Sequence, residues 1–168
     1  MSLSMYDASV PVFRQILTSL GEILGKAEIH AGERKIDPNA LLQARLFPDM
    51  FALTRQIQIA ADFAKGACAR LAGVEVPKYE DTEQSFADLR ARLEKTIAFI
   101  DSLPKAQIVG SEAREVQTSA GPKSKTFTGQ VYLTQYALPQ FFFHATTAYA
   151  ILRHNGVEVG KRDFMGKF

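Results

Sequence analysis

A glutamine and a histidine lie one helical turn apart in the most apolar stretch of the sequence. Gln140 and His144 fall inside the run from Tyr132 to Leu152, so in a helix both face the same inner stripe. A buried imidazole and a buried amide both need hydrogen-bond partners. The pair therefore indicates either a core hydrogen-bond network or a pocket that holds a metal or another ligand.

Two readings of this pair stay open. In the core reading, the imidazole of His144 bonds to the amide of Gln140 or to that of Gln56. In the pocket reading, His144 is the candidate catalytic residue, a general acid or base near neutral pH, and Gln140 orients the substrate or the imidazole.

Two further residues are candidates for the ligand pocket. Gln56 has the spacing from Leu53 and Ala60 that turns a side chain inward, whereas Gln58 is expected to be exposed or interfacial. Asp49 is most simply a first-turn acid at the positive end of a helix dipole, although a bundle could bring it near His144.

Length and charge limit the classes of protein to which this chain can belong. The 168 residues carry a net charge of +2 in a mixed pattern, which favours one domain over 1–168 and neither a nucleic-acid nor a membrane partner. The first residues lack a secretory pattern, so a cytoplasmic location is expected. Cys68, the only cysteine, lies among small residues and is expected to be a buried, inert thiol.

Apolar periodicity predicts four long helices and therefore an all-α fold, an up-down four-helix bundle. The long helices are expected at about 9–30, from Pro48-Asp49 to Gly73, from Asp81 to Ser102, and from Thr128 to Asn155, with a short extra helix over 37–42. Residues 106–128, with the breaker Ala120-Gly121-Pro122, read as a small hairpin or irregular segment. Pro139 predicts a kink just before Gln140.

Surface features are expected as follows. Phe141, Phe142 and Phe143 cannot all face one core, which favours a homodimer. The C-terminal tail is expected to dock through Phe164. A solvated set of cations is expected at Lys65, Arg70, Lys161 and Arg162.

Several stretches resemble the DinB/YfiT-like superfamily, whose members are regarded as metalloenzymes, and more closely a family of unknown function within it. The superfamily likeness rests on the predicted helices, the inward histidine and the ending Ala150–Val157. The closer likeness is carried by Ser4–Tyr6, Arg34–Pro38, Ala44–Leu46, Pro48–Phe51, Arg55–Ala60, Ala64–Gly73 and Phe141–Asp163.

The resemblance implies a bundle, often dimeric, with a divalent metal held by one histidine on the second long helix and a His-x-x-x-His pair on the last. Some members are thiol-dependent S-transferases, and others are hydrolases or isomerases. In this chain His144 falls at the second histidine of the pair and Gln140 at the first. The second long helix offers Asp49, Gln56 and Gln58 instead of a histidine, so any zinc or nickel site is degenerate.

Two functions follow as hypotheses. The first is a small-molecule-binding or non-catalytic dimer without a cofactor, whose pocket is marked by Gln56, Gln140 and His144. The alternative is a metal-dependent transferase or hydrolase, similar to the thiol S-transferases, in which His144 is the remaining ligand of a zinc or nickel ion or the acid-base group.

Overall fold

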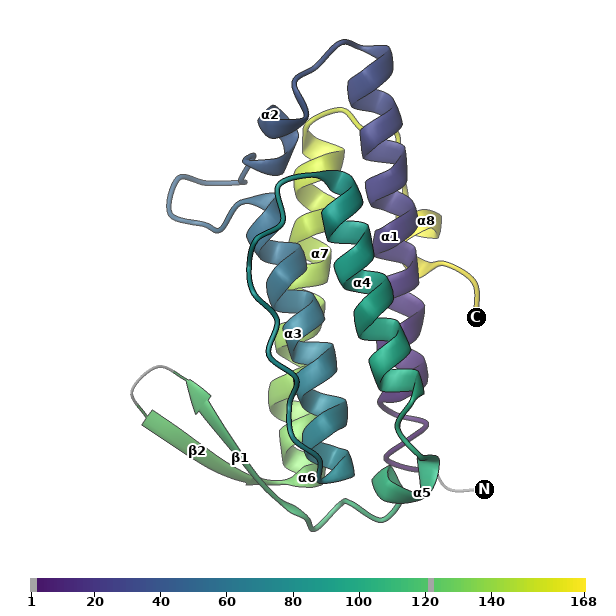
Figure 1. Ribbon diagram of the computed structural model, residues 1–168, viewed down its shortest axis with the longest axis vertical. Helices are drawn as coiled ribbons and strands as arrows, with labels where there is room; N and C mark the ends of the chain where they lie inside the picture. The colour runs from purple at the N-terminus through teal and green to yellow at the C-terminus, as the bar shows by residue number, and fades with distance from the viewer. Residues whose placement is uncertain (1–2, 121–122) are drawn as a thin grey trace.

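The computed structural model describes residues 3–120 and 123–168 and shows a mostly helical protein with one small sheet (Figure 1). The long helices are α1 (Val10–Glu33), α3 (Leu53–Ala72), α4 (Phe86–Asp101) and α7 (Leu138–His154). The short ones are α2 (Pro38–Leu42), α5 (Lys105–Ile108), α6 (Gly129–Val131) and α8 (Lys161–Met165), and a π-helical segment, η1 (Tyr132–Ala137), leads into α7.

The expectation of a purely α-helical protein is corrected by an antiparallel sheet. Strand β1 (Glu115–Ala120) pairs with β2 (Lys123–Thr128), with Val116 opposite Phe127. This is the hairpin that the sequence allowed between the last two long helices. Of the predicted breaker Ala120-Gly121-Pro122, residues 121 and 122 lie outside the described residues.

The four long helices lie side by side, but their directions do not alternate (Figure 1). α3 runs opposite to α1, and α4 then runs in the same direction as α3, because residues 73–85 cross back along the length of the helices before α4 begins. Ion pairs from Arg90 to Glu28 and from Arg14 to Asp101 place α4 antiparallel to α1. The predicted up-down alternation is therefore wrong at α4.

Two predicted helix starts are also wrong. α3 begins at Leu53, not at Pro48-Asp49, because residues 43–52 form a loop in which Arg45 Nη1 donates to the carbonyl oxygens of Pro48 and Met50 at 3.4 and 3.1 Å. α4 begins after Ser85, whose hydroxyl accepts a hydrogen bond from the Asp88 amide at 3.1 Å. Asp49 and Asp81 consequently precede their helices.

Other helix ends agree with the sequence. Asp37 caps α2 by accepting from the Asn39 amide at 3.0 Å. Gly73 ends α3 with a φ of 72°, and Gly156 follows α7 with a φ of 86°, both in the left-handed region that favours glycine. The tail docks as expected, since the rings of Phe164 and Tyr149 lie 5.7 Å apart.

The predicted kink at Pro139 takes the form of a widened turn. Pro139 has no amide hydrogen, and in a regular α-helix its ring would collide with the carbonyl of Gln135. The preceding residues adopt the π conformation, in which the Leu138 amide donates to the carbonyl of Leu133 five residues earlier. Pro139 then occupies the first turn of α7, where an amide hydrogen is not required.

The core lies between the long helices, and α3 packs most extensively against α7. The small side chains of Ala60, Ala64 and Ala67 are fully buried and let α7 approach closely. Cys68 is buried, and this burial raises the pKa of its thiol far above the usual value, as expected for an inert residue. Within 3–120 and 123–168, no helix is both long enough and apolar enough to cross a bilayer.

Candidate functional site

His144 and Gln56 meet between α7 and α3. The Nδ1 atom of His144 lies 2.7 Å from Oε1 of Gln56, and both side chains are buried. Nε2 of Gln56 donates to the backbone carbonyl of Phe51 at 3.1 Å, which fixes the orientation of the amide. Of the two partners that the sequence allowed for His144, the structure therefore uses Gln56.

This arrangement sets the tautomer of the imidazole. Because the Gln56 amide group donates to Phe51, its oxygen faces His144 and can only accept, so Nδ1 of His144 carries the proton. Nε2 then has a lone pair and no hydrogen, and among the described residues it has no hydrogen-bond partner. His144 is thus oriented to accept a hydrogen bond or a proton at Nε2.

The surroundings favour the uncharged form of the imidazole. Burial lowers the pKa of His144 below its ordinary value of 6.5, and the positive charge of Arg55 lowers it further. The ring of Phe63 stacks on the imidazole with centroids 6.1 Å apart and planes 13° apart, and the ring of Phe143 stands edge-on at 5.2 Å. A neutral, aromatic-flanked imidazole suits hydrogen bonding to a ligand or general base chemistry.

The other predicted site residues are placed differently. Gln140 is half-buried and makes no side-chain hydrogen bond to any described residue; with Tyr136 and Phe143 it lines a surface hollow of about 260 Å³. Asp49 lies exposed in the loop before α3. Its expected place in the first helical turn is therefore wrong, and Gln56 is the residue from this region that reaches His144.

The donor atoms around His144 do not fit a zinc or nickel site. The Oε1 atom of Gln56 is occupied by the imidazole, Gln140 makes no side-chain hydrogen bond to a described residue, and Asp49 lies exposed in the loop before α3. Zinc and nickel bind proteins mainly through several imidazole, thiolate or carboxylate ligands. In the described part of the chain, no three His, Cys, Asp or Glu side chains are grouped so that they could hold a metal ion.

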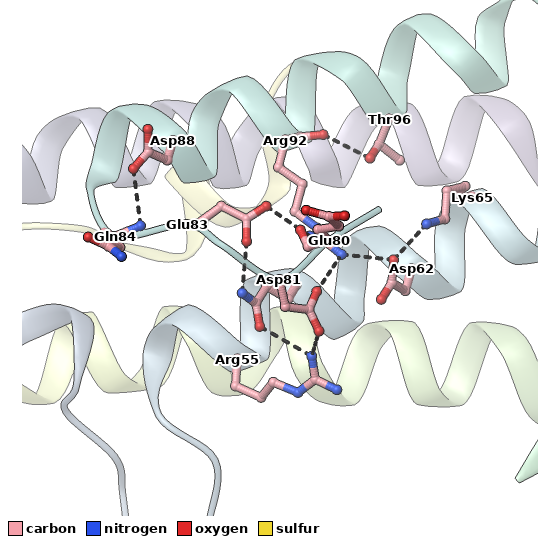
Figure 2. A network of polar contacts seen from close by, with 11 residues as sticks. Arg55, Asp62, Lys65, Glu80, Asp81, Glu83, Gln84, Asp88, Arg92 and Thr96 are labelled. Atoms are coloured by element: carbon pink, nitrogen blue, oxygen red, sulfur yellow. Dashed lines mark hydrogen bonds and ion pairs between the residues drawn. The ribbon is translucent and has the colours of Figure 1, made fainter. Parts of the chain in front are cut away.

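A network of charged side chains joins α3, α4 and the segment that connects them (Figure 2), and it includes Arg55, the residue before Gln56. At its centre is Arg92 of α4, whose side chain is only 2% exposed. Arg92 donates to Glu83 at 2.8 Å and pairs with Asp62 and Asp81 at 3.0 and 3.1 Å, and it also donates to the carbonyl oxygen of Glu80. The network ties the crossing segment 73–85 to both α3 and α4.

The network is closed through Gln58 and Arg55. Gln58 donates to the second carboxylate oxygen of Glu83 at 2.8 Å and accepts from Arg55 at 3.2 Å. Arg55 in turn pairs with Asp81, which completes a ring of contacts back to Arg92. Gln58 is buried by these contacts, so the expectation that it is exposed or interfacial is wrong.

Lys65 is also buried by the crossing segment, which corrects its assignment to a solvated set. Its ammonium group pairs with Asp62 at 2.9 Å and lies 3.7 Å from the centre of the Tyr79 ring. Arg70, assigned to the same set, is half-buried and donates to the hydroxyl of Tyr132 at 3.2 Å. Lys161 and Arg162 are exposed as expected.

Sequence reasoning missed three residues that shape the site. Phe63 lies seven residues after Gln56, two helical turns along the same face, and this spacing was the available signal. Arg92 falls between Leu89 and Leu93 on an inward stripe, where a charged side chain predicts a buried partner. Arg55 carries no comparable signal, because its role depends on Asp81, which a distant segment supplies.

Comparisons with known proteins agree with this fold. A family described as a domain of unknown function (DUF1993) matches residues 5–165. A solved structure described as a DinB family member protein from Shewanella denitrificans is 41% identical, with a TM-score of 0.88 over 97% of this chain and 92% of that chain. The comparison with curated proteins gives no match.

Proposed function

The chain belongs to the DUF1993 family, and we propose that it is a small-molecule-binding protein of DinB-like four-helix-bundle type whose site works without a metal. The observation that carries this proposal is the fixed contact between His144 Nδ1 and Gln56 Oε1, which leaves Nε2 as an acceptor. A ligand with an O–H, N–H or S–H group would donate to this atom. Gln140, one turn away at the surface hollow, would contact the same ligand.

The degenerate metal site is part of the proposal. Gln140 replaces the first histidine of the pair that the resemblance implies, and Gln56 occupies the place on α3 that faces His144. A neutral amide is a weak ligand for zinc or nickel. The same amide is a good partner for a neutral imidazole, so the two glutamines support a hydrogen-bonding site better than a metal centre.

The test is a fragment-binding experiment on tag-free protein, followed by elemental analysis of the same sample. Fragments that carry a hydrogen-bond donor should shift the side-chain signals of Gln56 and His144 in two-dimensional NMR, and His144→Gln should abolish binding. His154→Gln is the matched control, because His154 is an exposed histidine at the far end of α7. Stoichiometric zinc or nickel that is lost in His144→Gln would contradict the proposal and favour a metal-dependent transferase or hydrolase.

A homodimer also belongs to the proposal, and its support is an exposed apolar surface. The loop 43–52 carries Leu46 and Phe47, which are 40% and 63% exposed. Large apolar side chains grouped in one loop favour burial against another surface. Sedimentation equilibrium should give a dimer that Phe47→Ser weakens, and a monomer at high protein concentration would refute this part.

A further inference from the structure

We propose that the ligand of the His144 site is a small aromatic carboxylate, whose carboxylate binds Arg55 and whose O–H or N–H group donates to Nε2 of His144. This inference rests on the proposed function, because it needs a ligand at His144. It goes further in assigning the charge and chemical class of that ligand. The residues that carry it are Arg55, Phe51 and Phe143.

Arg55 has an unused edge for an anion. Its side chain is 42% exposed, and all its hydrogen bonds to described residues leave from Nη1, which donates to Gln58 and to Asp81. A guanidinium group has five N–H donors arranged as forks that match a carboxylate. The edge formed by Nε and Nη2 has no hydrogen-bond partner in 3–120 or 123–168, so its N–H groups can donate to a carboxylate from solution.

Phe51 connects this guanidinium group to the imidazole. Its backbone carbonyl holds the amide of Gln56, which holds His144, while its ring lies 6.0 Å from the Arg55 guanidinium carbon. Arg55 also immediately precedes Gln56 in α3. Its charge lowers the pKa of His144, which agrees with a guanidinium group close to the imidazole. The proposal places one ligand across both groups, next to the contacts that Phe51 makes with Gln56 and with Arg55.

Exposed aromatic rings favour a ligand with an apolar, planar body. Phe51 and Phe143 are 55% and 56% exposed, and each adjoins one end of the site: Phe51 faces Arg55, and Phe143 lies edge-on to His144. Aromatic rings pack well against such surfaces. The site thus supplies a cation, a hydrogen-bond acceptor and two apolar faces, which together match a hydroxylated aromatic carboxylate.

Asp81 competes with the carboxylate of the ligand for Arg55, and this competition can be tested. Its carboxylate, on the crossing segment, already pairs with Arg55 and partly neutralises it. Asp81→Asn removes this competitor and should strengthen binding of a carboxylate. Asp62→Asn is the matched control, because Asp62 also pairs with Arg92 and is equally exposed, but it does not contact Arg55.

The experiment titrates the full chain with 3-hydroxybenzoate and 4-hydroxybenzoate, and with their uncharged methyl esters, by two-dimensional NMR at millimolar concentrations. At least one acid should bind about tenfold more tightly than its ester, because it gains a charge-assisted contact. Arg55→Gln should remove this preference. Asp81→Asn should tighten binding of the acid several-fold, whereas Asp62→Asn should leave it unchanged.

The outcomes separate this inference from the proposed function. Acids and esters that bind equally, with binding lost in His144→Gln, would overturn the carboxylate assignment and leave the small-molecule site intact. Binding of the acid that persists unchanged in Arg55→Gln would also overturn it. If no acid or ester shifts the signals of Gln56 or His144, the carboxylate assignment fails, and the fragment experiment then decides the proposed function alone.

Discussion

Replacing Arg92 by methionine should destabilise the protein by about 3 kcal/mol, because a buried carboxylate would lose its cation. The side chain of Arg92 is 2% exposed and that of Glu83 is 10% exposed, with 2.8 Å between their nitrogen and oxygen atoms. Removing one partner of a buried pair costs roughly 3–5 kcal/mol, since the remaining charge is left uncompensated. The pair with Glu83 therefore dominates the loss.

The other contacts of Arg92 add little to this figure. Asp62 and Asp81 are 39% and 40% exposed, and they keep their ion pairs with Lys65 and Arg55. Exposed pairs contribute at most about 1 kcal/mol each, and water takes over much of the lost interaction. Methionine also fills most of the volume of the arginine stem, which keeps a cavity from adding to the cost. The expected loss therefore stays at the lower end of the range.

The assay is urea unfolding of the variant, with Arg90→Met as the matched control. Arg90 lies on the same helix and pairs with Glu28, but both side chains are about 40% exposed, so that change should cost less than about 1 kcal/mol. Adding Glu83→Gln to Arg92→Met should recover most of the loss, because it removes the uncompensated charge. A loss in Arg92→Met no larger than in Arg90→Met, or no recovery in the double variant, would refute this reasoning.

Three further predictions concern the histidine and two helix ends. Burial and Arg55 hold the pKa of His144 below 6.5, so the unfolded chain binds more protons at this residue than the folded chain does. The free energy of unfolding should therefore fall as pH drops below about 6.5. His144→Gln should remove this contribution, and an unchanged pH profile in the variant would contradict the prediction. Ser85→Ala should cost about 1 kcal/mol in urea unfolding through loss of the α4 cap, and no loss would mean that the cap adds nothing. Gly73→Ala should lower the thermal midpoint and reduce the free energy of unfolding by about 1 kcal/mol or more, because a φ of 72° strains a residue that has a side chain. An unchanged midpoint would contradict this prediction.

The helices follow from the sequence because their signals are local. Apolar stripes such as Phe13, Leu17, Leu20 and Leu24 mark a buried face wherever the helix packs, so the four long helices were predicted with most of their ends. The sequence also allows Gln56 as one of two hydrogen-bond partners for His144, because each of these residues lies on the inward face of its own helix.

The direction of α4 and the charged network could not be predicted, because they depend on where a distant segment lies. The sequence predicts a helix start at Asp81, but the segment that carries it crosses back along α3 and α4 and brings it to Arg55 and Arg92. The sequence predicts a solvated Lys65 because Tyr79, from the same segment, is not a sequence neighbour. Charges that look solvated on one helix become buried when such a segment covers them.

The contact between the loop 43–52 and α3, which belongs to the site, could not be predicted from the sequence either. A proline followed by an acid is a common helix start, so the sequence predicts that Asp49 lies in the first turn. The structure instead uses backbone carbonyls of this loop, among them that of Phe51, which orients the Gln56 amide. A backbone carbonyl can accept a hydrogen bond whatever side chain the residue carries, so the sequence gives no sign of this part of the site.

The metal-free site at His144 is tested most directly by the tautomer of its imidazole ring, measured by ¹⁵N NMR in tag-free protein at neutral pH, before and after addition of zinc. We expect a neutral ring with the proton on Nδ1, a bare Nε2, and no change with zinc, because Gln56 fixes Nδ1 and the donors of the described residues do not complete a metal site. A proton on Nε2, a charged ring, or a shift of Nε2 at stoichiometric zinc would contradict it.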